Sequence, residues 1–560
     1  MPLFVALITT HHINGRHAAV VAALFLMVFS VVPMSFAAIS DQQQLELGKR
    51  IYREGVLPSG GTLRASVQGG VPLTGAQAAC VRCHQRSALG SSEGGKVVPP
   101  LRGTMAPEPA VVPEKASSPP RNGSGRHTYS AVTLSRALRE GVDPAGRKFD
   151  TLMPAYQLSR DEVAALHAYL SAFPAGPDPG VDGRNIHFAT VIAGAVNTVS
   201  RQALLNVLQT YFKEKNAETR SETVRRAYAA RAQEKMYRAH RTWVLHVWEL
   251  KGSPASWPAQ LENYYRQQPV FALLSGVSAG DWQPVHDFCE RREVPCLFPN
   301  TDAPPVADDA LYSIYFSKGV ALEAQVLARH LRAPAHGALT GTMMQVYRDD
   351  GAGRRAAQAL RAALSGADAA KLVDRVITGG SPTEQFWGTL LERDRPSLLM
   401  LWLHTADLTG LRAVLKPVAN GVFLSSSLIG DDLRQLPQAL PGQGYLLHPF
   451  VLAQDRDRTL ARTRIWLRSR KIVAADERLL ANSYFAVTVA GEALMHMRDN
   501  FSRDYFIERV EHSVDNALNS SVYPHVSLGP GQRYASKGAY IIRLQEGQPT
   551  SAPVSGWIIP

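Results

Sequence analysis

The chain lacks the features that mark several large classes of protein. Charged residues make up 19% and apolar residues 45% of its 560 positions, which indicates neither a disordered chain nor a multi-pass membrane protein. After Val32, no apolar run approaches the roughly 20 residues that a transmembrane helix needs. The sequence also has no H-E-x-x-H metal motif and no phosphate-binding P-loop. Its length predicts about two to four domains.

The first 37 residues have the pattern of a secretory signal peptide. Arg16 and His17 precede an apolar run over 18–32, and Ser35 and Ala37 are the small residues expected just before a cleavage site. We expect cleavage after Ala37, with an uncleaved inner-membrane anchor as the alternative. The mature chain is then expected in the periplasm, an oxidising compartment, with no transmembrane span.

The net charge is strongly positive. It is +12, from 60 Lys and Arg against 48 Asp and Glu, and the excess is spread along the chain. Only residues 219–241 are locally dense in Arg, in a helical pattern that we interpret as a solvated helix face. A nucleic-acid-binding protein would show a basic face and a reader module, and the sequence shows no such module, so we expect no nucleic-acid partner. A basic surface that steers an acidic redox partner or an anionic ligand is the alternative.

The pattern of apolar and polar residues along the chain changes near residue 180. Before it, the patterns predict helices over 42–53, 131–140 and 159–173, the last opened by a capping box of Ser159 and Glu162. Residues 174–183 are rich in Pro and Gly and are expected to be a linker. Beyond the linker, short apolar runs alternate with amphipathic helices, which indicates parallel α/β sheets in two lobes. The predicted strands are 186–192, 243–248, 270–274, 295–298, 338–346, 397–403 and 421–424.

Cys80-Val81-Arg82-Cys83-His84 is the strongest signal for chemistry in the sequence. Two Cys three positions apart on one helical turn can each form a thioether to a haem, and the adjacent His then offers its imidazole to the iron. A thioredoxin-type C-x-x-C would follow a strand and gives His84 no role. A zinc site would need a second pair of ligands at short spacing, which the sequence does not have. We therefore predict one covalently bound haem c.

The segment around this motif resembles class I c-type cytochromes, over about residues 39–173. The resemblance implies an all-α cytochrome c domain and a Met as the second axial ligand of the iron. Met153, followed by Pro154 just before the last helix, fits that role, and Met105 is the alternative. The metal ligands would then be His84 and Met153. The loop over 99–101 would hold the His84 ring through a carbonyl group. With both axial positions filled, the iron transfers electrons and has no open site for a substrate.

Residues 271–302 have the pattern of a strand, a loop of small residues, a helix and a second strand, and a late-strand pattern follows Tyr523. On these features the region from Arg184 to Pro560 resembles periplasmic binding proteins of the leucine/isoleucine/valine group (type I). The resemblance implies that Ser278 and Thr301 bind the ligand, through hydroxyl and amide groups at a helix start. Cys289 and Cys296 remain after the haem takes two cysteines. Their separation of seven favours a disulfide, worth about 2 kcal/mol, over two buried thiols.

Together these patterns divide the chain into a signal peptide (1–37), a cytochrome c domain (38–173), a linker (174–183) and a binding-protein-like domain (184–560). The leading hypothesis is a periplasmic electron carrier fused to a module that binds a small molecule or a partner, with no catalytic site of its own. Its redox partner would be a dehydrogenase or another cytochrome. The alternatives are a solute-binding protein of an ABC importer for an amino-acid-like ligand, with haem as a redox sensor, and a cytochrome subunit of a dehydrogenase complex.

Overall fold

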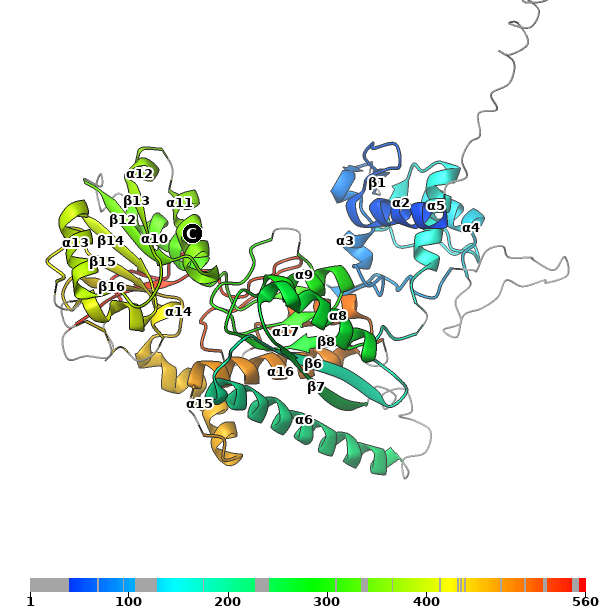
Figure 1. Cartoon of the computed structure of the whole chain (residues 1–560). Helices are drawn as coiled ribbons and strands as arrows, with labels where there is room; N and C mark the ends of the chain where they lie inside the picture. Colours follow the sequence, from blue (N-terminus) through cyan, green and yellow to red (C-terminus); the bar gives the residue numbers. More distant parts are fainter. Residues whose placement is uncertain are drawn as a thin grey trace, which may run out of the picture. The chain divides into compact units, whose positions relative to one another are not determined.

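Figure 1 shows a computed structural model of the chain. It describes residues 40–105, 128–226 and 241–560, except for gaps at 68–69, 94, 175, 308–309, 334–340, 365, 412–413, 431–432, 434–435, 438–439, 474–475, 498–499, 517–520 and 546–552. The predicted signal peptide lies outside the described residues. Within them, no helix is long and apolar enough to cross a membrane.

Contacts divide the chain into two compact units. The first comprises the residues up to Cys83 and Gly103–Phe173, and the second comprises His84–Arg102 and Pro174–Pro560. The short stretch after His84 therefore belongs, by its contacts, with the α/β part of the chain.

Three helices dominate the first unit: α2 (Asp41–Glu54), α4 (Ala131–Glu140) and α5 (Arg160–Ser171). All three were predicted from the sequence, and Ser159 and Glu162 form the predicted capping box at the start of α5. Helices α2 and α5 cross at Gly48, where an added Cβ would lie 2.1 Å from the Ala165 carbonyl oxygen. Tyr52 and Tyr169 pack beside this crossing, with ring centroids 5.5 Å apart.

The expectation of an all-α cytochrome region is wrong in detail. Strands β2 (Pro72–Thr74), β1 (Arg64–Ser66) and β5 (Ala155–Tyr156) form a small antiparallel sheet in the first unit. In β1 only Ala65 is buried between two exposed neighbours, the alternation of a strand with one face inward. Such a short strand carries too little pattern to be recognised without its partners. The remaining short elements are η1 (Gly75–Gln77), α3 (Val81–His84) and the pair β3 (Ser92–Glu93) and β4 (Lys96–Val97).

The second unit contains two sheets, of which the first has the order β11-β10-β8-β6-β7 and is parallel throughout, with β9 also paired to β6. Alternate residues of β6 face opposite layers. Phe188 and Ile192 pack with α6 and α16, while Ala189 and Val191 pack with α8 and α9. The elements are β6 (Asn185–Ala193), α6 (Thr198–Arg226), β7 (Thr242–Leu250), η2 (Pro254–Ser256), α8 (Trp257–Gln267), β8 (Ala272–Leu274), β9 (Val277–Ser278), α9 (Gln283–Arg292), β10 (Cys296–Leu297), β11 (Ser313–Ile314), α16 (Glu477–Met497) and α17 (Arg503–Ser513).

The second sheet has the order β13-β12-β14-β15-β16-β17, and only β17 runs antiparallel to its neighbour. Helices α10 and α11 cover one face, and α13 and η4 cover the other. The elements are α10 (Val320–Leu331), β12 (Met343–Arg348), α11 (Gly351–Ala363), α12 (Ala367–Ala370), β13 (Leu372–Ile377), α13 (Glu384–Asp394), β14 (Leu398–Trp402), η4 (Thr405–Leu411), β15 (Val422–Ser425), α14 (Ser426–Ile429), β16 (Gly444–His448), α15 (Ala453–Ser469) and β17 (Tyr540–Arg543).

The predicted parallel α/β architecture is confirmed by these two sheets. Each of the seven predicted strands corresponds to an observed one, although several are shorter than their apolar runs. The arrangement of the two sheets as lobes around a cleft stays a prediction. The stretch 174–183 is more tightly packed than its composition suggests, because Gly180, at φ +94°, lies against the backbone of Phe271 where no side chain would fit.

Candidate functional site

The C-x-x-C-H motif consists of Cys80, in a turn, and the single helical turn α3 (Val81–His84) that follows it. The backbone N–H of Arg82 donates to the Ala79 carbonyl (3.1 Å), and that of Cys83 donates to the Cys80 carbonyl (3.2 Å). Neither cysteine is in a disulfide. Burial raises the pKa of the Cys80 thiol to about 12, whereas Cys83 is exposed. Both sulfurs therefore belong to one turn and neither is in a disulfide, as thioether attachment requires.

The His84 ring is buried and held by one backbone group. Only 5% of the residue is exposed, and its Nδ1 lies 3.1 Å from the Pro99 carbonyl oxygen. Because a carbonyl oxygen can only accept, Nδ1 carries the hydrogen, and Nε2 is the nitrogen with a lone pair for a metal. Burial lowers the pKa of His84 to about 4, which keeps the ring neutral. The loop predicted to orient this ring therefore does so, through Pro99.

Met153 lies in a turn of the first unit, where its backbone N–H donates to the Asp150 carbonyl (3.0 Å). Three residues later, the buried Tyr156 hydroxyl donates to the Ala78 carbonyl (3.1 Å), two residues before Cys80. This bond ties the strand that follows Met153 to the start of the haem motif. Met105, the alternative ligand, pairs with Tyr129 in an isolated bridge.

These residues fit a covalently bound haem. Cys80 and Cys83 would form its thioether links, His84 would offer Nε2 to the iron, and Met153 would offer a thioether sulfur. The fit rests on the donor set and on the engaged Nδ1 of His84. Among the residues that the structure describes, no group of three or more His, Cys, Asp or Glu side chains could hold a separate metal ion.

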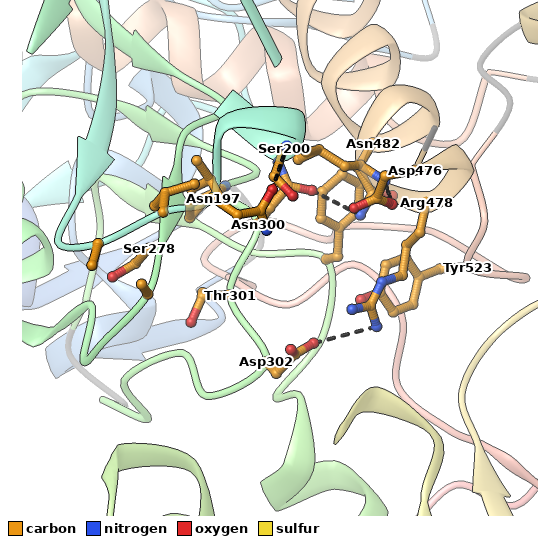
Figure 2. A pocket seen from close by; sticks show the side chains of 17 residues that line it. Asn197, Ser200, Ser278, Asn300, Thr301, Asp302, Asp476, Arg478, Asn482 and Tyr523 are labelled. Carbon is orange, nitrogen blue, oxygen red and sulfur yellow. Dashed lines mark hydrogen bonds and ion pairs between the residues drawn. The ribbon is translucent and has the colours of Figure 1, made fainter. Parts of the chain in front are cut away.

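A second candidate site lies at the carboxyl edge of the first sheet (Figure 2). It is a cavity of about 310 Å³ between the loops after β6, β9 and β10 and the start of α16. The carboxyl ends of parallel strands are where α/β sheets bind their ligands. The lining residues are Ala195, Val196, Asn197, Ser200, Val277, Ser278, Ala279, Pro299, Asn300, Thr301, Asp302, Phe316, Asp476, Arg478, Leu479, Asn482 and Tyr523.

Two asparagines join α16 to this edge of the sheet. Asn482 Nδ2 donates to Asn300 Oδ1 (3.1 Å), and Asn300 Nδ2 donates to the Gly276 carbonyl (3.0 Å) and to Ser275 Oγ (3.0 Å). Since the Gly276 carbonyl can only accept, it sets the orientation of both amides. One wall of the cavity is thus held by a chain of hydrogen bonds that runs from Asn482 through Asn300 to the Gly276 carbonyl.

One ion pair crosses the same cavity. Arg478, near the start of α16, lies 3.4 Å from the Asp302 carboxylate, and its guanidinium stacks over the Phe450 ring at 5.3 Å. Asp476 caps the helix by accepting the Leu479 N–H at 3.0 Å. The cavity therefore offers amide, hydroxyl and guanidinium groups to a small polar ligand.

The structure brings the predicted ligand residues Ser278 and Thr301 to this one cavity. Ser278 Oγ donates to the Gly280 carbonyl (2.9 Å) and accepts the Gly280 N–H (3.0 Å), so its hydroxyl is engaged in its own turn. Thr301 Oγ1 accepts the Ala303 N–H at 3.3 Å. Their role in binding stays a prediction. Arg478 and Asn482 escaped the sequence analysis, because no local pattern marks them and Asn482 lies 182 positions after its partner Asn300.

Cys289 and Cys296 are both fully buried. Burial raises the pKa of the Cys289 thiol, and a hydrogen bond with Cys296 raises it further, so the two sulfurs lie close together. The disulfide between them stays a prediction.

Residues 74–173 match the family model of cytochrome c. No curated protein matches the chain. Among solved structures, a fatty acid ABC transporter substrate-binding protein from Thermomonospora curvata is 14% identical, with a TM-score of 0.48, covering 69% of this chain and 95% of its own. A leucine binding protein from Thermotoga maritima is 9% identical (TM-score 0.49; 67% and 99% covered). A solute binding protein from R. palustris, in complex with benzoate, is 11% identical (TM-score 0.48; 67% and 97%). Residues 74–173 are thus similar to cytochrome c, and they are joined in one chain to a unit built on two mainly parallel α/β sheets.

Proposed function

We propose that this protein is a periplasmic electron carrier in which a single haem c is attached through Cys80 and Cys83 and ligated by His84 and Met153. Haem c, when bound, accepts and donates one electron at a time. The observation that carries the proposal is the engaged Nδ1 of His84, held by Pro99 in a stretch that matches cytochrome c. The Pro99 carbonyl orients the His84 imidazole, and the two cysteines next to it would supply both attachment points for the haem.

The α/β unit is, in this proposal, a two-lobed module that binds a small molecule or a redox partner and so brings the haem near its electron source. The polar cavity at the first sheet supports a small ligand, with Ser278 and Thr301 among its contacts. The same cavity favours the second candidate function, a solute-binding protein of an importer with haem as a redox sensor. A thermal-shift screen of small metabolites on the full-length protein tests the module. A compound that raises the melting temperature equally with oxidised and reduced haem would favour the second candidate.

Haem attachment tests the electron-carrier proposal directly. We expect the double variant Cys80→Ala/Cys83→Ala, secreted from a host that matures c-type cytochromes, to carry no covalently attached haem, that is, no haem that stays with the chain after denaturation. The matched control is Cys289→Ala/Cys296→Ala, which removes two other cysteines and should keep its haem. Denaturing gels stained for haem give the answer. Staining that persists without Cys80 and Cys83 would refute the assignment.

A further inference from the structure

The segment that follows His84 is bonded to helix α17 by a half-buried carboxyl group, that of Glu508. Ser87, three residues after His84, is 1% exposed. Its N–H donates to Glu508 Oε1 (2.9 Å), and its hydroxyl donates to Glu508 Oε2 (2.7 Å). Each carboxyl oxygen therefore accepts one hydrogen bond from the same residue. Both residues belong to the second unit.

The charged neighbours of Glu508 have partners of their own. On α17, Asp504 accepts from the Tyr312 hydroxyl (2.8 Å) and lies 3.7 Å from Arg86 of the His84 segment, and Glu511 pairs with the buried Arg533 (2.7 Å). Arg509 and His512 of the same helix line the adjacent cavity. Among the described residues, no Lys, Arg or His side chain forms an ion pair with Glu508. Its carboxylate is stabilised by the two neutral donors of Ser87.

This environment suits a group that exchanges a proton. Burial raises the pKa of Glu508 to about 7, helped by the nearby carboxyl groups of Asp504 and Glu511 and opposed by the two Ser87 hydrogen bonds. A cavity of about 560 Å³, lined by Glu508 together with Gln85, Leu89 and Gly90 of the His84 segment, gives the carboxyl a route for proton exchange.

The chain itself keeps this carboxyl near the iron. Three residues span at most about 11 Å, so the Cα atoms of His84 and Ser87 cannot be further apart, and Glu508 bonds directly to Ser87. The iron would lie one side chain beyond His84, and the carboxylate lies one side chain beyond Ser87. In this half-buried setting the two charges interact, because the protein interior screens charges less than water does.

We propose, building on the proposed function, that Glu508 is a proton-binding site coupled to the redox state of the haem. When an external one-electron donor reduces the iron from Fe(III) to Fe(II), the Glu508 carboxylate takes up one proton from solvent, and on oxidation the carboxyl group releases it. An ionised Glu508 favours the more positive ferric state, and a reduced iron in turn makes the carboxyl harder to ionise, as linkage requires. The protein would thus carry a proton together with its electron.

The test is the midpoint potential of the holoprotein, measured by spectroelectrochemical titration from well below to well above neutral pH. For wild type, we expect the potential to fall as pH rises through the titration of Glu508, by at most about 59 mV for each tenfold drop in proton activity. Glu508→Gln keeps the acceptor for Ser87 but cannot ionise, so this fall should vanish. The matched control is Glu392→Gln, which removes the same charge at an exposed site and should behave as wild type.

Two further measurements separate a proton site from a merely structural contact. Ser87→Ala removes the hydroxyl donor that stabilises the carboxylate, so the fall in potential should move to higher pH. A reduced-minus-oxidised infrared spectrum should show the C=O stretch of a protonated carboxyl in wild type, and Glu508→Gln should lack it. Identical curves of midpoint potential against pH for wild type and Glu508→Gln would refute this inference but leave the proposed function standing. A protein that purified without haem would refute the proposed function and this inference with it.

Discussion

At the scale of single residues, the candidate haem site depends on groups that are each held by one backbone contact. His84 is oriented by the Pro99 carbonyl, and the strand after Met153 is anchored by the Tyr156 hydroxyl on Ala78. The first contact engages Nδ1 of His84 and so leaves Nε2 for the iron, and the second holds the strand that follows Met153. The second axial ligand is the assignment that most needs a test, since the sequence offers two candidate methionines, Met153 and Met105.

We expect Met153→Ala to abolish the weak red absorption that marks a Met sulfur bound to ferric haem, and to lower the midpoint potential, because a thioether favours Fe(II). Met105→Ala is the matched control and should keep both properties. Optical spectra of the oxidised protein and a redox titration measure the two effects. If Met105→Ala loses the absorption and Met153→Ala keeps it, the ligand assignment has to be exchanged.

At the scale of elements, the first unit depends on how closely α2 and α5 approach. Gly48 has no room for a Cβ, since the atom would lie 2.1 Å from the Ala165 carbonyl oxygen and 2.7 Å from Tyr169 Cβ. By contrast, Gly388 in α13 has only Val414 Cγ1 within reach, at 3.8 Å. The two residues are both helical glycines, so helix propensity alone predicts the same effect for both.

We therefore expect opposite results from two identical changes. Gly48→Ala should destabilise the first unit by about 1–3 kcal/mol, because the crossing helices must separate. Gly388→Ala should stabilise its own helix by about 1 kcal/mol, because alanine restricts the unfolded chain and nothing crowds its methyl group. Thermal unfolding followed by haem absorbance and by circular dichroism separates the two. Equal effects would show that α2 and α5 do not pack at Gly48.

At the scale of the whole molecule, one buried acid connects stability to pH. Glu323, on α10, is fully buried, and its Oε1 accepts from the Ser427 N–H (3.1 Å) and hydroxyl (2.6 Å) on α14. Burial raises the pKa of Glu323 to about 8 from an ordinary value of 4.5, and the Ser425 and Ser427 hydrogen bonds only partly oppose this rise. The folded chain therefore holds a proton that the unfolded chain loses.

This difference sets the direction of the pH effect. Below pH 4.5 the Glu323 carboxyl is protonated in both the folded and the unfolded chain, so it does not change the free energy of unfolding with pH. Between pH 4.5 and about 8 only the unfolded chain releases this proton, so the free energy of unfolding falls as pH rises. The loss is on the order of 5 kcal/mol across this window. Glu323→Gln cannot ionise and should remove this part of the dependence, leaving the smaller part that the raised pKa of Glu508 contributes, whereas exposed Glu392→Gln should change neither part. Chemical denaturation at several pH values measures it, and equal slopes in all three proteins would contradict the assignment.

The sequence by itself predicted a haem site and a parallel α/β architecture, and the two sheets confirm the second of these. The C-x-x-C-H motif predicts its cofactor locally, because five consecutive residues would supply both attachment points and one iron ligand. The capping box at Ser159 and the apolar runs of the buried parallel strands also carry their signals within a few residues. Tertiary structure alone decided the polar cavity and the bond between Ser87 and Glu508. Asn300 and Asn482 are 182 positions apart, and Ser87 and Glu508 are 421 apart. Contacts over such separations are set by how sheets and helices pack, and no local pattern of residues records them.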